Sequence, residues 1–157
     1  MVAYSFQKRF GPPILSGRKR HTIRAERAGR SRHARPGEAV QLYTGMRTKH
    51  CRLLGEPACT AVLPVRMNLR AGIVFANDGW IRLPIDLDLF AVADGFRDWD
   101  DLLAFWAEQH PGVTDFSGVM VQWHPLIPLQ PLAPLEQELL EHGIDVAQAW
   151  EEAARGG

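Results

Sequence analysis

Cysteine is scarce in this sequence. Its 157 residues include two, Cys51 and Cys59. Seven residues separate them, and zinc sites use tighter, paired spacings, so the pattern predicts no metal site. A chain of this length buries roughly two-thirds of its unfolded surface and needs no disulfide or metal to fold. We expect free or buried thiols in a reducing compartment, with no metal and no cofactor.

Long apolar runs are also missing. No segment approaches the ~18 apolar residues that a membrane span requires. The first nine residues lack the apolar core of a signal peptide. These two absences lead us to expect a cytoplasmic protein with no membrane partner.

Acidic residues are rare in the first part of the chain. Residues 1–50 hold 12 Lys and Arg but two acids, Glu26 and Glu38, whereas residues 51–157 hold 6 Lys and Arg and 16 acids. The net charge is therefore zero. Two interpretations remain open: the basic segment forms a face that attracts a polyanion such as RNA, or the two parts neutralise each other across the fold.

Alternating and helical patterns predict the secondary structure. Extended segments are expected at residues 4–10, 19–24, 39–44, 51–54, 58–65, 72–75, 80–83 and 116–123. Helical spacing follows over 85–96 and 99–108, where Asp98 is a plausible N-cap. Short strands with helices inserted late favour an α+β fold, built as a small β-barrel of about six strands with flanking helices.

The chain divides near residue 125. Residues 1–124 carry the predicted domain, and residues 125–134 contain four prolines, a composition that cannot occupy the centre of a sheet. We expect an extended strap there, followed by an acidic helical tail over 135–154. Residues 25–36 are polar, basic and without periodicity, which predicts a loop.

The most informative stretch is Gly17–Arg24, whose basic residues are Arg18, Lys19, Arg20 and Arg24. A run of this kind is typical of a solvated face or a nucleic-acid patch. The pattern Phe10, Ile14-Leu15, Gly17, Lys19 and Thr22-Ile23-Arg24 resembles the opening motif of the ASCH domain family. Gly37-Glu38 before a strand, and a helix after Asp94-Gly95-Phe96, extend the resemblance over residues 4–124.

The resemblance implies a PUA-like β-barrel with a cleft beside it. It also implies recognition of RNA or a modified nucleoside. Some bacterial members of the family are amidohydrolases that convert N4-acetylcytidine to cytidine and acetate, whereas others are proposed RNA binders or ribonucleases. In the amidohydrolases the motif supplies a lysine and a threonine, which match Lys19 and Thr22 here. The third catalytic residue, usually Glu in the family, falls near Asp94.

Elementary chemistry sets conditions on such a site. Threonine is a poor nucleophile until a base removes its proton, and lysine is a base only when neutral. Burial and neighbouring arginines lower a lysine pKa, whereas a carboxylate such as Asp94 opposes that shift. Residues three apart on an ideal strand point to opposite faces, so Lys19 and Thr22 converge only if the chain bends between them. The alternative is a surface lysine and an ordinary strand threonine.

Three functions therefore stay open: hydrolysis of N4-acetylcytidine, RNA binding without catalysis, and ribonuclease activity. In a binding module, Arg18, Arg20 and Arg24 would contact phosphates, and Tyr43 could stack on a base. On a strand, however, a residue such as Tyr43 is more often half-buried packing. His21 is expected to face solvent or a neighbour, although its pKa could place it near neutrality.

Overall fold

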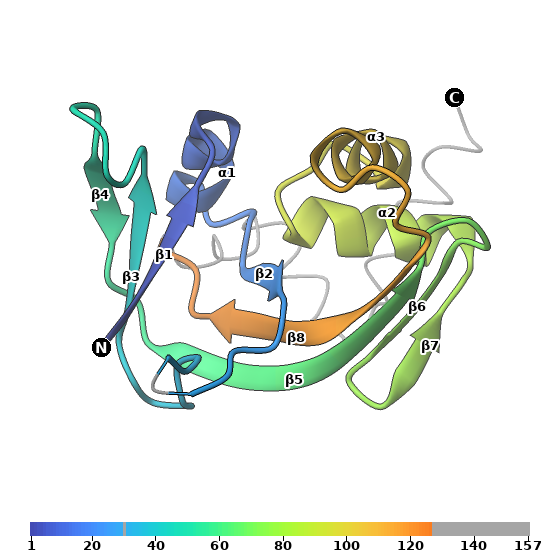
Figure 1. Ribbon diagram of the computed structural model, residues 1–157, viewed down its shortest axis with the longest axis horizontal. Coiled ribbons are helices and arrows are strands. Elements are labelled where there is room, and N and C mark those ends of the chain that lie inside the picture. Colours follow the sequence, from blue (N-terminus) through green and yellow to red (C-terminus); the bar gives the residue numbers. More distant parts are fainter. Residues whose placement is uncertain (30, 127–157) are drawn as a thin grey trace, which may run out of the picture.

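The computed structural model describes residues 1–29 and 31–126, which form eight strands in two sheets together with three α-helices (Figure 1). This arrangement confirms the α+β class. The predicted tail at 135–154, and all of the strap beyond Leu126, lie outside the described residues. Among the helices described, none is both long enough and apolar enough to cross a bilayer.

The smaller sheet has the strand order β1-β3-β4. Its members are β1 (Val2–Phe6), β3 (Val40–Thr44) and β4 (Arg52–Gly55). β1 runs parallel to β3, and β4 is antiparallel to β3. Alternate residues of these strands, Tyr4, Phe6, Val40 and Leu42, are buried. This period of two is that of a sheet with one face on the core.

The larger sheet has the order β2-β8-β5-β6-β7. Its members are β2 (His21–Arg24), β8 (Asp115–Trp123), β5 (Cys59–Asn68), β6 (Ile73–Ala76) and β7 (Gly79–Ile81). All its pairings are antiparallel, and β5 with β8 forms the longest ladder. β2 lies at one edge, where β8 is its single strand partner among the described residues.

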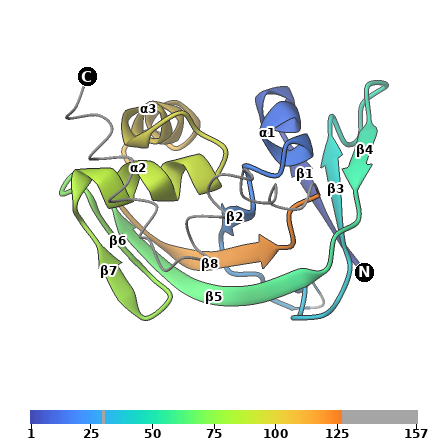
Figure 2. The same cartoon turned by 180° about the vertical axis from the view of Figure 1, so that it is seen from behind.

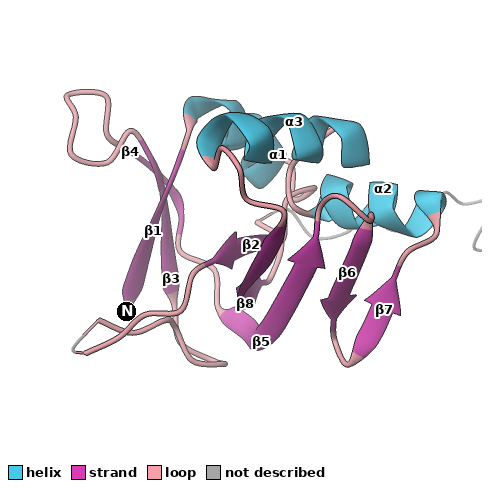
Figure 3. Cartoon of the chain, turned by 45° about the vertical axis from the view of Figure 1, so that its right-hand side comes forward, coloured by secondary structure: helices cyan, strands magenta, loops and turns pink. Residues whose placement is uncertain are grey.

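Within residues 1–29 and 31–126 the two sheets do not close into a barrel, so the predicted barrel of about six strands is not confirmed (Figure 3). The chain between β1 and β2 forms a 3-10 turn, Lys8–Phe10, and the short helix α1 (Gly11–Leu15), so β1 and β2 join different sheets. Within the described part of the chain, one isolated β-bridge joins Ala39, next to β3, to Ala58, next to β5. The prediction of a strand through residue 10 is wrong because Phe10 reaches the core from that turn.

Two longer helices cover one face of the larger sheet (Figures 1 and 2). They are α2 (Pro84–Ala93) and α3 (Trp99–Gln109). The Asp98 side chain caps α3 by accepting a 2.8 Å hydrogen bond from the Asp101 backbone N–H, which confirms the predicted N-cap. Phe90 of α2 and Leu102 of α3 are buried. The helices therefore close the core above β2 and β8.

Candidate functional site

A turn before β2 brings Lys19 and Thr22 to the same side of the strand. Gly17 has a φ of 79°, a left-handed conformation that favours glycine. The Lys19 backbone N–H then donates to Pro13 O at 2.9 Å, and β2 begins only at His21. Lys19 therefore lies outside the strand ladder, in the bend that convergence with Thr22 requires.

Lys19 is buried rather than exposed. Its side chain is 3% exposed, and Nζ forms an ion pair with Asp94 Oδ1 at 2.9 Å. Nζ also donates to His21 O at 2.8 Å and to Asp94 O. An ammonium group has three N–H donors, so all three have acceptors. The faces of Phe10 and Phe6 lie 5.0 and 5.4 Å from Nζ, and the surface-lysine interpretation does not fit this environment.

Gly95 allows the chain to pass tightly over Lys19. Its φ is 95°, and a Cβ at this position would lie 2.8 Å from Lys19 Cδ and 3.0 Å from Phe10 Cδ1. Contacts this short are essentially not seen for real Cβ atoms. The turn that follows α2 therefore requires glycine for two reasons, backbone conformation and space, and it holds Asp94 against Lys19.

Arg24 positions the Thr22 hydroxyl and joins the two sheets. Its Nε donates to Thr22 Oγ1 at 3.2 Å, and its Nη2 donates to Ser5 O on β1 at 2.8 Å. The guanidinium lies 5.0 Å from the Phe6 ring centroid. Within residues 1–29 and 31–126, no hydrogen bond links Lys19 to Thr22. Thr22 is thus oriented by Arg24.

Burial shifts the ionisation of the site. It lowers the pKa of Lys19 below the ordinary lysine value, while the Asp94 carboxylate opposes this shift and Arg24 adds to it. Burial also lowers the pKa of His21 to about 4, again against the effect of Asp94. His21 is therefore a neutral imidazole at pH 7, and a lysine with a lowered pKa approaches the condition for a general base.

A cavity of about 350 Å³ adjoins these groups. Lys19, Thr22, Arg24 and Asp94 line it together. The remaining wall is largely aromatic and includes Phe6, Phe10, Phe96, Phe105, Trp106 and Phe116. This volume lies at the small end of the range for ligand pockets, roughly 300–1,000 Å³. The cavity thus combines a polar end with flat apolar walls.

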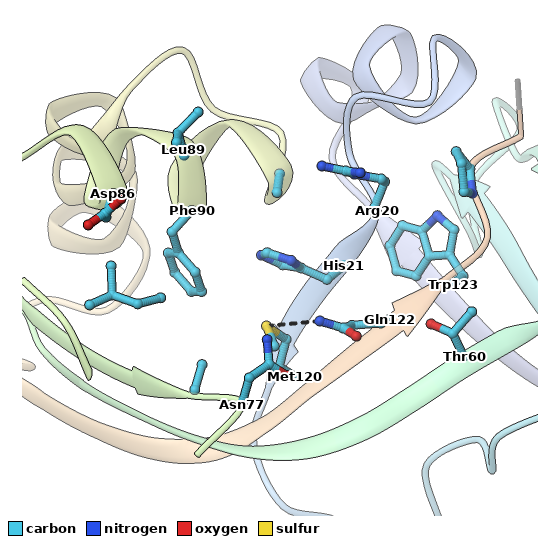
Figure 4. A pocket seen from close by; sticks show the side chains of 14 residues that line it. Arg20, His21, Thr60, Asn77, Asp86, Leu89, Phe90, Met120, Gln122 and Trp123 are labelled. Atoms are coloured by element: carbon cyan, nitrogen blue, oxygen red, sulfur yellow. Dashed lines mark hydrogen bonds between the residues drawn. The ribbon is translucent and has the colours of Figure 1, made fainter. Parts of the chain in front are cut away.

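The other predicted binding residues lie elsewhere. Arg20 lines a second cavity, shown in Figure 4, and Arg18 is exposed and lines neither cavity. Tyr43 is half-buried and alternates with the core residue Leu42, so its side chain is on the outer face of β3 and does not line the first cavity. Of the four predicted binding residues, Arg24 alone joins Lys19, Thr22 and Asp94.

Part of the basic segment is already neutralised or packed. Arg32 forms a 2.8 Å ion pair with Glu38, which also pairs with the N-terminal amine. Arg27 lies 5.1 Å over the Tyr4 ring. Ion pairs between the two parts of the chain join Arg9 to Asp101 and Lys19 to Asp94. Arg18, Arg20 and Arg35 remain exposed, so both interpretations of the charge asymmetry stay open.

Sequence reasoning missed two features of the site. His21 is buried, with its ring 5.1 Å from Phe90 and its Nε2 3.7 Å from Asp94 Oδ1. Gln109 and His110, at the end of α3, line the first cavity. Burial of His21 depends on α2, which is remote in sequence, so the local pattern carried no signal for it. The same holds for Gln109 and His110, which the fold brings beside β2.

Within residues 1–29 and 31–126, no three His, Cys, Asp or Glu side chains lie close enough together to hold a metal ion. Comparison with known proteins gave no match to the chain among family models, curated proteins or solved structures. The resemblance to the ASCH family therefore stays a prediction from the residue pattern, and the geometry of the site carries the functional interpretation.

Proposed function

We propose that the chain recognises a modified nucleoside in the first cavity and hydrolyses N4-acetylcytidine to cytidine and acetate. The observation that carries this proposal is the convergence of Lys19, Thr22 and Asp94 on one cavity from two distant parts of the chain. We also propose that the fold is an open relative of the PUA-like, ASCH-type fold, on the strength of the residue pattern from Phe10 to Arg24.

The cavity suits a flat base that carries a small polar substituent. Aromatic walls such as Phe10 and Phe105 would contact the base, and stacking on an aromatic side chain contributes about 1–3 kcal/mol per base. The acetamide would then point to the end formed by Lys19, Thr22 and Arg24. This orientation places the amide carbonyl beside a hydroxyl nucleophile and a guanidinium donor.

In the proposed reaction, Thr22 Oγ1 attacks the acetyl carbonyl carbon and neutral Lys19 takes the hydroxyl proton. Lys19 exchanges one of its present acceptors for Thr22 as the substrate binds, since catalytic hydrogen bonds often tighten only in the complex. Arg24 donates to the carbonyl oxygen as it gains negative charge. The C–N4 bond then breaks, and the proton on Lys19 passes to the departing N4 amine.

The second half of the reaction hydrolyses the acetyl ester on Thr22. Water attacks the ester carbonyl while neutral Lys19 accepts a proton from it. The ester C–O bond then breaks, acetate leaves, and Lys19 returns the proton to Thr22 Oγ1 to restore the hydroxyl. Within each half-reaction, Asp94 stabilises the transient ammonium form of Lys19 through its 2.9 Å contact. No electron leaves or enters the system, and water is the single co-substrate.

Acetate release from N4-acetylcytidine by the purified chain tests this function. We expect turnover by the wild-type protein and a loss of at least about 100-fold in Thr22→Val and in Lys19→Met. Lys49→Met and Thr114→Val, at exposed positions away from the cavity, are matched controls that should keep full activity. Absence of turnover by the wild-type chain would overturn the catalytic proposal.

Recognition without catalysis is the second candidate. It is favoured by one observation, that all three N–H donors of Lys19 already have protein acceptors. Lys19 would then support the cavity wall, and exposed Arg18 and Arg35 would contact phosphates. Affinity for RNA should in that case fall steeply with salt, because cations bound to phosphates are released. Binding of RNA that varies little between low and physiological salt would contradict this candidate.

A further inference from the structure

A second cavity, of about 600 Å³, is not used by the proposed function (Figure 4). Its walls come from β2, β8, α2 and the turn between β6 and β7. Among the described residues that line it, Asp86 is the only acid, and Figure 4 shows it at the opposite side from Arg20. The cavity thus has a cationic side that is well separated from its one carboxylate.

Trp123 carries a buried donor beside this cavity. Its side chain is almost fully buried, at 2% exposure, and its Nε1 has no hydrogen-bond partner among the described residues. Buried polar groups in native proteins nearly always have a partner, and an indole N–H can only donate. In Figure 4 the indole nitrogen lies on the upper edge of the ring, and Arg20 lies above and to the left of the ring. The indole N–H therefore lacks an acceptor at this wall of the cavity.

Arg20 is fixed next to Trp123 by its backbone. Its N–H donates to Ala93 O at the end of α2 at 2.9 Å, and its carbonyl oxygen accepts from the Trp123 N–H at 3.0 Å. The guanidinium is exposed and takes part in none of the ion pairs found within the described chain. It extends over the cavity in Figure 4. An anion bound here would receive charge-assisted hydrogen bonds.

Gln122 adds a third donor to the same side. Its Nε2 lies 4.0 Å from Met120 Sδ, and a thioether is a weak acceptor, so the amide is free to donate to a better one. Figure 4 shows Gln122 between Trp123 and Met120. The far wall is apolar and includes Phe90, Leu89 and Ile81. The polar side of the cavity thus lies opposite an apolar wall.

We propose that this cavity binds a small anion that carries a planar apolar body. The carboxylate or phosphate would accept from Arg20, Trp123 Nε1 and Gln122, and the body would pack against Phe90 and Leu89. Both headgroups share the required chemistry, namely several acceptor oxygens and a negative charge. This site is separate from the cavity lined by Lys19, so it can exist whether or not the chain hydrolyses a nucleoside.

Titration of the full chain, labelled with ¹⁵N, by benzoate, phenyl phosphate and benzamide tests the site. The indole N–H resonance of Trp123, identified by its loss in Trp123→Phe, should move downfield as an anion saturates the protein. Benzamide has the shape of benzoate without its charge, and we expect it to bind at least about tenfold more weakly. Saturation by benzoate alone or by phenyl phosphate alone supports the proposal and identifies the headgroup.

Two variants complete the test. Arg20→Gln should weaken binding of the preferred anion by at least about tenfold, to the level of benzamide. Arg70→Gln removes an exposed arginine that lines neither cavity, and its affinity should equal that of the wild type. The proposal is overturned if neither anion moves the Trp123 resonance, if benzamide binds as well as benzoate, or if Arg20→Gln keeps wild-type affinity.

Discussion

Lys19 and Asp94 lie 75 residues apart in the chain, and their side chains form an ion pair, 2.9 Å from Nζ to Oδ1, that solvent barely reaches. The pair forms the polar end of the first cavity, and the same Oδ1 of Asp94 lies 3.7 Å from His21 Nε2. A buried ion pair contributes little net stability, but removal of one partner leaves an uncompensated charge in the core. Stability measurements can therefore examine this site independently of any activity.

Asp94→Asn should lower the free energy of unfolding by about 3–5 kcal/mol, because it leaves Lys19 buried without a counter-charge. The double variant Lys19→Met/Asp94→Leu removes both charges and should recover part of that loss. Urea denaturation at pH 7 measures the free energy of unfolding of the wild type, of Asp94→Asn and of the double variant. Asp78→Asn, at an exposed turn position with a φ of 58°, is the control and should change stability by less than about 0.5 kcal/mol. A double variant less stable than Asp94→Asn would contradict this account.

Gly95→Ala should be markedly more destabilising than Gly112→Ala. Both glycines have a positive φ, 95° and 81°, so each alanine incurs about 1–2 kcal/mol of backbone strain. A Cβ at position 95 also meets Lys19 and Phe10, whereas position 112 has open space. Displacement of these packed side chains should add about 1–3 kcal/mol. Equal unfolding free energies for the two variants would show that the turn tolerates the added methyl group.

Acid should destabilise the chain partly through His21. Its pKa is about 4 in the folded protein and near 6.5 when unfolded, so the unfolded state binds the proton more tightly. The contribution of His21 to stability is therefore complete above about pH 6.5 and is lost progressively as the pH falls towards 4. The His21 contribution to the free energy of unfolding cannot change by more than about 1.4 kcal/mol per pH unit. Over the whole range, from above pH 6.5 to below pH 4, the loss is about 3 kcal/mol.

Unfolding free energies of the wild type and His21→Phe between pH 7 and pH 4.5 measure this effect. Other groups titrate in both proteins, so the difference between the two curves isolates His21. We expect the wild type to lose stability faster over this range. Parallel curves would mean that the His21 imidazole takes up its proton at the ordinary pH and that burial does not perturb it.

Arg24→Lys keeps the charge but loses the two-point contact with Thr22 Oγ1 and Ser5 O. We expect the free energy of unfolding to fall by about 1 kcal/mol. If the proposed hydrolysis is correct, kcat for acetate release should fall by at least about tenfold, with a smaller change in KM, because Thr22 is no longer oriented. Arg52→Lys, on exposed β4, serves as the matched control. Wild-type kcat in Arg24→Lys would remove Arg24 from the mechanism.

Local patterns predicted individual elements better than their assembly. The helix at 99–108 and its Asp98 cap were expected from apolar spacing and a capping residue, both of which act within one turn. The first strand was extended too far because Phe6 and Phe10 fit an alternating pattern, yet Phe10 is buried from a 3-10 turn. The predicted barrel is not confirmed: its closure depends on which distant strands pair, as β2 does with β8, and periodicity says nothing about distant partners.

In the candidate site, too, the residue types were predictable from the sequence, whereas their surroundings were not. The resemblance singled out Lys19 and Thr22 together, and it singled out Asp94, but the residues alone favoured an exposed lysine in a basic run. Burial of Lys19 depends on Asp94 and on the Phe6 and Phe10 rings, which the fold supplies. The prediction that Tyr43 stacks on a base rested only on its aromatic ring. The alternation of side chains along β3 places Tyr43 outside the first cavity.

The position of β2 at a sheet edge has a consequence for how the chain folds during translation. β2 is made early, but Thr22 pairs with Val121, so the ladder that holds it cannot form until β8 has left the ribosome. β1 and β3 can associate much sooner. Because long-range pairings form slowly, the strand that carries Thr22 and Arg24 joins the structure after most of the core strands have been synthesised. The first cavity is consequently among the last parts of the molecule to take shape.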